Sequence, residues 1–100
     1  MSVYVVAQGR VENRKMLDEY VSKVLPTIQA GGGRLVAFDE SPEVVEGKSD
    51  HPRTVIIEFS SRQAFRAWYD SPEYQAVLPL RLRSTPGTLI VVEGLEGASG

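Results

Sequence analysis

The chain has 100 residues, of which 42% are hydrophobic and 24% are charged, and its formal net charge is −2 at pH 7. This composition predicts one globular domain over 1–95, followed by a flexible tail at 96–100. Because acidic and basic residues are interspersed, neither a nucleic acid nor a membrane surface is expected as a partner. The absence of cysteine excludes disulfides, zinc knuckles, iron–sulfur clusters and a thiol nucleophile.

The N-terminal stretch 1–8 has neither a basic start nor a long apolar run, so no signal peptide is expected. No apolar segment approaches the ~20 residues that a membrane span needs. These features favour a cytoplasmic protein of bacterial type.

Three elements are expected in the first half of the chain. Residues 3–8 are β-branched and aromatic, which is typical of a strand. Asn13 can cap a helix whose apolar residues recur at helical spacing, and the glycines at 31–33 end that helix. A second strand is expected at 34–39, and the valines at 44–45 are a candidate extension of it.

The second half begins with a strand at 53–59, in which apolar residues occupy both alternating sets of positions. Residues 60–63 resemble a capping box, with Ser60 as the cap of a short helix. Ser71, followed by a proline, starts another helix. Residues 78–83 fit either a strand or a helix, and 88–93 form the last strand.

This order of elements, β-α-β-β-α-β, predicts an α+β protein of ferredoxin-like topology, with a four-stranded antiparallel sheet and helices on one face. A sheet face in contact with water normally alternates toward polar residues. Here Val3 and Val5 alternate with Tyr4 and Val6, so both faces are apolar. Since two helical segments cover only one face, we expect a homodimer formed through the other face.

Aromatic residues gather at the junction of the two short helices, where Trp68, Tyr69 and Tyr74 surround the sequence Asp70-Ser71-Pro72. Together with Tyr20, they pack either in the core or around a flat ligand slot with phenol donors. Arginines that include Arg81 flank this segment and are either solvated or able to hold a carboxylate.

Two residues are candidates for acid–base chemistry. His51 is the only histidine, and it is either a loop residue or a general acid/base at a pocket mouth. Glu58 lies in a strand that should be interior, where it either pairs with an arginine such as Arg81 or Arg83, or serves a pocket, unless it lies at a strand end close to water. No ligand spacing indicates a metal site, and no motif indicates a cofactor.

Seven segments of the chain together resemble the family catalogued as domain of unknown function 1330. These segments are Tyr20, 32–34, 45–47, 55–59, 67–75, 80–81 and 91–94. The segment 67–75 is the most specific of them, and the resemblance extends from about Val3 to Leu95. One departure is the hairpin at 38–42, which lacks the glycines that relatives tend to carry there.

The resemblance implies the fold of the dimeric α+β barrels, which include cofactor-free monooxygenases and muconolactone isomerases. It also implies a dimer and a helical conformation for 74–83, and it assigns no catalytic residue. The candidate pocket that it suggests is formed by Tyr20, Glu58, Trp68, Tyr69, Tyr74 and Arg81.

Three functions remain open at this point. The first is a module that binds a small polar or carboxylated metabolite in an aromatic-lined pocket between the sheet and the helices of a homodimer. The second is a cofactor-independent enzyme acting on an aromatic or enolic molecule, with His51 or Glu58 as the base. A purely structural or protein-partner domain is the third alternative. Since no acid and base occur at motif spacing, the binding module is favoured.

Overall fold

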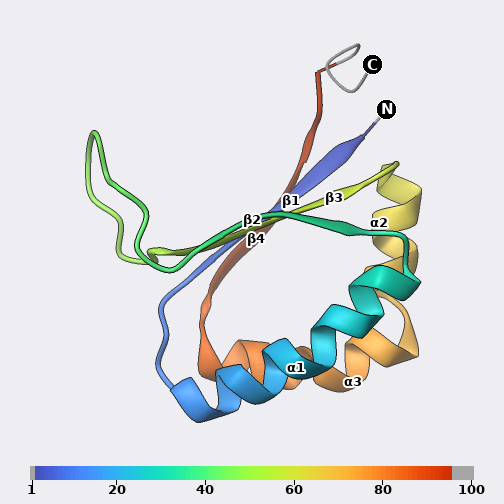
Figure 1. Ribbon diagram of the computed structural model, residues 1–100, viewed down its shortest axis with the longest axis horizontal. Helices are drawn as coiled ribbons and strands as arrows, with labels where there is room; N and C mark the ends of the chain where they lie inside the picture. The colour runs from blue at the N-terminus through green and yellow to red at the C-terminus, as the bar shows by residue number, and fades with distance from the viewer. Residues whose placement is uncertain (1, 96–100) are drawn as a thin grey trace.

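The computed structural model describes residues 2–95, which form a four-stranded sheet with all three helices on one of its faces (Figure 1). In chain order the elements are β1 (Val3–Gly9), α1 (Arg14–Ala30), β2 (Arg34–Asp39), β3 (Arg53–Phe59), α2 (Arg62–Tyr69), α3 (Pro72–Ser84) and β4 (Gly87–Glu93). The tail expected at 96–100 lies outside the described residues.

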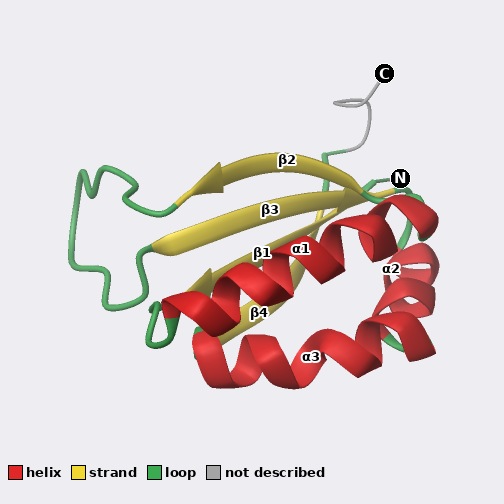
Figure 2. Ribbon diagram, turned by 60° about the horizontal axis from the view of Figure 1, so that its bottom comes forward, coloured by secondary structure: helices red, strands yellow, loops and turns green. Residues whose placement is uncertain are grey.

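The sheet is antiparallel throughout, with strand order β2-β3-β1-β4. The central strand β1 pairs with both β3 and β4, so that Val5 lies between Ile57 and Val91. Helices α1 and α3 lie side by side below the sheet, and α2 covers one end (Figure 2). This arrangement confirms the ferredoxin-like topology, in which the second helical segment is divided into α2 and α3.

Local signals account for most element boundaries. The side chain of Asn13 accepts a hydrogen bond from the Met16 amide at 3.0 Å, and Ser71 Oγ accepts one from the Tyr74 amide at 3.1 Å, as expected of N-caps. Gly32 has φ of 80°, a conformation that favours glycine, directly after α1. The ambiguous stretch 78–83 is helical and belongs to α3.

Two local expectations were wrong. The cap of α2 is Ser61, whose Oγ accepts from the Ala64 amide at 3.0 Å, because the helix begins one residue later than a cap at Ser60 requires. The valines at 44–45 do not extend β2, because the chain leaves the sheet after Asp39. The connection 40–52 instead forms a long projecting loop (Figure 1).

The strand register assigns side chains to the two faces of the sheet. Val3, Val5, Ile57 and Phe59 point toward the helices and are buried in the core. Their alternate neighbours, among them Tyr4, Val6, Ile56 and Glu58, point to the face that no helix covers. We call these the inner face and the outer face of the sheet.

Candidate functional site

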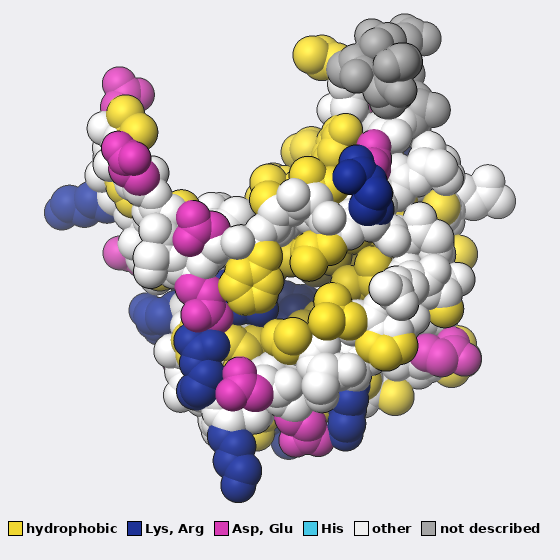
Figure 3. Space-filling model, in the orientation of Figure 1, with side chains coloured by type: hydrophobic (Ala, Val, Ile, Leu, Met, Phe, Trp, Pro, Cys, Tyr) yellow, Lys and Arg dark blue, Asp and Glu magenta, His cyan; other side chains and the backbone are white. Residues whose placement is uncertain are grey.

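A cavity of about 60 Å³ lies between the inner face of the sheet and the helices. This is more than the 10–15 Å³ that one water molecule needs. Its walls come from every strand and every helix, and they are Val5, Ala7, Tyr20, Val21, Val24, Leu25, Ile28, Leu35, Phe38, Arg53, Val55, Ile57, Trp68, Arg81 and Leu89. In the space-filling view a hollow opens at this place, rimmed by hydrophobic side chains and with basic side chains inside it (Figure 3).

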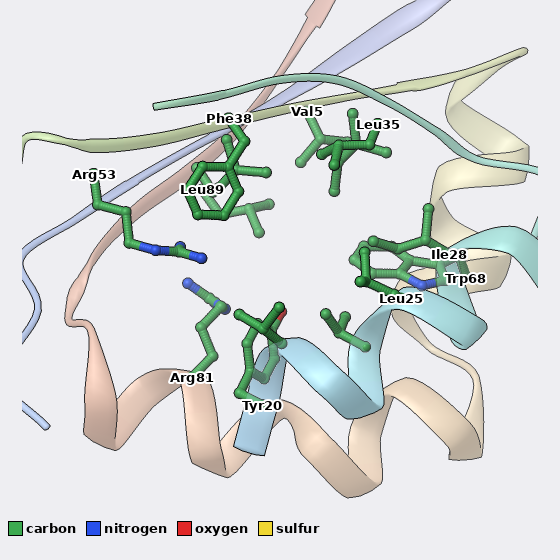
Figure 4. A pocket seen from close by; sticks show the side chains of 15 residues that line it. Val5, Tyr20, Leu25, Ile28, Leu35, Phe38, Arg53, Trp68, Arg81 and Leu89 are labelled. Carbon is green, nitrogen blue, oxygen red and sulfur yellow. The ribbon is translucent and has the colours of Figure 1, made fainter. Parts of the chain in front are cut away.

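Two arginines enter the cavity from opposite layers. Arg53 starts β3 and Arg81 lies on α3, and their guanidinium groups point toward one another (Figure 4). Arg53 points inward because every second residue of a strand faces the same side, and Val55 and Ile57 face the helices. Two cations that converge in an otherwise apolar cavity favour an anion between them.

Arg53 is 93% buried, since only 7% of its surface is exposed, and its Nε atom has no hydrogen-bond partner among the described residues. A Glu40 carboxylate oxygen lies 3.4 Å from that Nε, but both Glu40 oxygens are hydrogen-bonded to Arg14, at 2.9 and 3.0 Å. Burial lowers the pKa of the Arg53 guanidinium, and the nearby Glu40 charge opposes this effect. The Phe38 ring covers the guanidinium at 5.0 Å. Because almost none of the Nε surface is accessible, the part of Arg53 that a ligand can meet is the rest of the guanidinium group, which points into the cavity (Figure 4).

A hydrogen-bonded chain of three side chains adjoins the arginines. Arg81 Nε donates to Tyr74 Oη at 3.2 Å, and the Tyr74 and Tyr20 hydroxyls lie 3.0 Å apart. Burial is the main cause that raises the pKa of Tyr20, and the neighbouring Tyr74 raises it further. This phenol therefore stays protonated at neutral pH. Tyr20 therefore acts in the cavity as a neutral hydrogen-bonding group.

The opposite end of the cavity is apolar. Trp68, Ile28 and Leu25 lie there, away from the guanidinium groups (Figure 4). The indole Nε1 of Trp68 donates to Thr27 Oγ1 at 3.0 Å, so its polar atom is already satisfied. The Trp68 ring also packs on Tyr74, with ring centroids 4.1 Å apart, which fixes this wall.

Glu58 does not line the cavity. The register places it on the outer face, where Oε1 accepts from Arg34 Nη2 at 2.7 Å and Oε2 accepts from Tyr4 Oη at 3.3 Å. Its arginine partner is thus Arg34 rather than Arg81. The Arg34 guanidinium is the main cause that lowers the pKa of Glu58. Because adjacent residues of a strand point to opposite faces, Glu58 cannot share the cavity with Ile57.

The structure brings together three of the six predicted pocket residues, which are Tyr20, Trp68 and Arg81. Tyr74 lies behind this wall, fully buried, and reaches the cavity only through Tyr20 and Arg81. Tyr69 packs against the Tyr74 ring and is not a lining residue. His51 lies half-buried in the loop before β3 and is also outside the lining.

A second hollow, of about 400 Å³, lies where α1, α2 and α3 meet. Trp68 lines it as well, together with Thr27, Ala30, Gly31, Ala67, Ser71 and Glu73. Its one charged lining residue, Glu73, is exposed. The smaller cavity has the stronger chemical features of a binding site.

Sequence reasoning missed Arg53, the most buried charged side chain of the site. The strand alternation does indicate an inward position for Arg53, because it belongs to the same set of alternate residues as Val55, Ile57 and Phe59. It also missed Leu35 and Phe38 of the edge strand β2, which line the cavity.

Within residues 2–95, no group of three or more His, Cys, Asp or Glu residues is arranged to hold a metal ion. None of the helices there has the length and apolar character of a membrane span.

Solved structures with the same architecture define the class as ferredoxin-like α+β proteins. A protein of unknown function from Rhodopseudomonas palustris, RPA0582, is 18% identical, with a TM-score of 0.80 over 94% of this chain and 82% of that one. A dimeric ferredoxin-like protein of unknown function from Jannaschia is 18% identical, with a TM-score of 0.72 over 94% of this chain and 100% of that one. A dabb family protein from Mesorhizobium loti is 14% identical, with a TM-score of 0.66 over 94% and 97%.

The family is also clear. The model of the family "Domain of unknown function (DUF1330)" matches residues 2–95, and the chain belongs to this family. No curated protein matches the chain significantly.

Proposed function

We propose that this protein binds a small carboxylated metabolite in the cavity between the sheet and the helices. The observation that carries the proposal is the convergence of Arg53 and Arg81 in a cavity whose other walls, apart from the Tyr20 hydroxyl, are apolar. A pocket of mostly apolar walls with a few converging polar groups is typical of small-molecule sites. Arginine suits a carboxylate because its planar fork can donate two parallel hydrogen bonds.

The lining residues support binding above catalysis. They include no Asp, Glu, His or Lys side chain, and Tyr20 is held in its protonated form. The two bases considered for an enzyme, His51 and Glu58, both lie outside the lining. The cavity therefore offers donors that stabilise an anion, without a base that removes a proton from a substrate.

We propose further that the protein acts as a homodimer through the outer face. This face carries Ile90 and Val92, which are 52% and 42% exposed in one chain, next to the half-buried Val6 and Ile56. An uncovered apolar sheet face of this kind is typical of an interaction surface. The relatives from Jannaschia and from Thermobifida fusca are dimeric ferredoxin-like proteins, which supports the same assembly here.

A thermal-shift screen of small carboxylic acids and their neutral amides tests the proposal. We expect acids to raise the melting temperature and amides to leave it unchanged. Arg81→Gln should abolish the shift, whereas the control Arg62→Gln, which removes an exposed arginine paired with Glu93, should retain it. Equal shifts from acids and amides, or acid shifts that persist in Arg81→Gln, would rule out carboxylate binding at this cavity.

A further inference from the structure

The polar end of the cavity presents mainly hydrogen-bond donors. Tyr74 Oη accepts from Arg81 Nε, and Tyr74 is fully buried. If Tyr20 donated to Tyr74, the Tyr74 proton would need another acceptor, and the described residues provide none. Tyr74 therefore donates to Tyr20, because buried hydroxyl protons are almost always paired.

This direction leaves the Tyr20 proton free at the cavity wall. The neighbouring groups are the guanidinium of Arg53 and that of Arg81, whose Nε is already bound to Tyr74. The two guanidinium groups have no acceptor to offer, and the Tyr20 oxygen already accepts from Tyr74. A ligand group that fills this end therefore needs acceptor atoms, which both oxygens of an ionised carboxylate supply.

The remainder of the cavity excludes a second charge. Beyond the arginines, a ligand meets Val24, Leu25, Ile28, Leu35 and the ring of Trp68. The Trp68 Nε1 is occupied by Thr27, so this end provides no free donor. Burying a second carboxylate or a phosphate against such walls is costly because nothing compensates for its lost hydration.

The open side of the cavity lies between β2 and α1. Leu35 and Phe38 on β2, and Leu25 on α1, line the cavity and are 43%, 48% and 41% exposed. These three residues form an apolar mouth to the cavity. A ligand with a hydrocarbon part can fill the apolar end and cover this mouth, whereas a fully polar ligand cannot.

We infer that the ligand is a monocarboxylate with an apolar body, bound with its carboxylate at Arg53, Arg81 and Tyr20 and with its body against Trp68. This inference rests on the proposed function and adds the orientation and the chemical class of the ligand. It assigns Arg53 as the residue that selects an anionic head group. The juxtaposition that carries it is a donor-rich end and an apolar end within one cavity.

A chain-length series tests the orientation. Acetate, butyrate, hexanoate and the neutral hexanamide would be titrated against the full chain by calorimetry. Each methylene that enters the apolar end should tighten binding about fourfold, from roughly 0.8 kcal/mol per buried methylene. Hexanamide and inorganic phosphate should bind at least tenfold more weakly than hexanoate. Because Trp68 is the only tryptophan, its fluorescence reports the apolar end, and hexanoate but not acetate should change it.

Variants distinguish the loss of contacts to the ligand head group from a general loss of folded structure. Arg53→Gln should weaken hexanoate at least tenfold, and Arg53→Lys should recover only part of this loss, because lysine lacks the planar fork. Tyr20→Phe should weaken hexanoate and leave hexanamide unchanged. Arg62→Gln and Tyr4→Phe are the controls for the same chemical changes outside the cavity. Circular dichroism confirms that each variant is folded.

The outcomes distinguish the inference from the proposal on which it rests. Acetate and hexanoate of equal affinity, with no fluorescence change, would overturn the orientation while carboxylate binding stands. Phosphate that binds more tightly than hexanoate would overturn the assignment of a monocarboxylate. A chain that binds none of the acids would overturn the proposed function as well.

Discussion

The two faces of the sheet carry similar apolar side chains in different surroundings. On the inner face, Val5 and Phe59 are 0% and 1% exposed beneath the helices. On the outer face, Ile90 and Val92 alternate with equally apolar residues, yet they remain open in one chain. The hydrophobic pattern of the strands shows that both sheet faces need to be shielded from water. The path of the helices decides which of the two faces is covered within one chain.

Charged side chains on the two faces also have different surroundings. On the inner face, Arg53 is buried beside a carboxylate that is itself bound to Arg14, and it retains an unpaired donor. On the outer face, Glu58 is satisfied by Arg34 and Tyr4. A buried guanidinium that faces a second one across a cavity favours an anionic ligand, while a satisfied ion pair beside an apolar patch fits an interface between chains.

The largest expected effect comes from truncating the inner face. Phe59→Ala removes a buried ring that packs on Phe65 and Trp68, with centroids 6.0 and 5.4 Å away. The free energy of unfolding should fall by about 3–5 kcal/mol, because the lost contacts leave a cavity. Urea unfolding measures this. A loss below about 1 kcal/mol would contradict the assignment of the inner face as the core.

A charge on the outer face should act on assembly instead of on the fold. Ile90→Arg should weaken the proposed dimer by about 2 kcal/mol or more, roughly thirtyfold in dissociation constant. Sedimentation equilibrium gives the mass, and circular dichroism tests the fold. Leu82→Arg, at an exposed leucine on α3, is the matched control and should leave the dimer intact. A wild-type chain that sediments as a monomer at micromolar concentration would contradict the interface.

The hydroxyls of two tyrosines offer a finer comparison of the faces. Tyr74→Phe leaves Arg81 Nε and the Tyr20 hydroxyl without a buried partner, so it should cost roughly 1–3 kcal/mol of unfolding free energy. Tyr4→Phe removes a half-buried bond to Glu58 at 3.3 Å and should cost about 0.5 kcal/mol. Thermal and urea unfolding of the pair measure the difference. Equal losses would show that the two hydroxyls are in similar surroundings.

The smallest effect concerns pH. Since Arg34 lowers the pKa of Glu58 in the folded chain, the ionised carboxylate adds stability above its ordinary pKa, near 4.3. That stability is lost as the pH falls through the lower, folded value. Glu58→Gln should therefore lose less stability between about pH 5 and pH 3 than the wild type. Parallel pH profiles of unfolding free energy for the two proteins would contradict the Arg34 pairing.

Much of the architecture followed from local chemistry. Asn13 and Ser71 were identified as caps because their side chains can accept a bond from an amide three residues on. The 32–33 glycine corner and the alternation in β1 and β3 gave the elements and their faces. The 78–83 stretch was ambiguous from periodicity alone, because Pro79 interrupts both patterns, and the family resemblance gave its helical state.

The site was predicted only in part. Trp68, Tyr20 and Arg81 were predicted as pocket residues from their types and from the resemblance, and they do line the cavity. Glu58 was grouped with them because a carboxylate inside a strand looks buried, although its alternate position turns it outward. Arg53 was passed over, since an arginine at a strand start usually points to water.

The amino-acid sequence by itself determined the order of the elements, most of their caps and the apolar character of both sheet faces, because these depend on neighbours within a few positions. Only the tertiary structure decided that Arg53 and Arg81, 28 positions apart, meet in one cavity and that Glu58 pairs with Arg34 across the outer face. Those relations depend on strand register and on the packing of α3 against α1, which join residues distant along the chain.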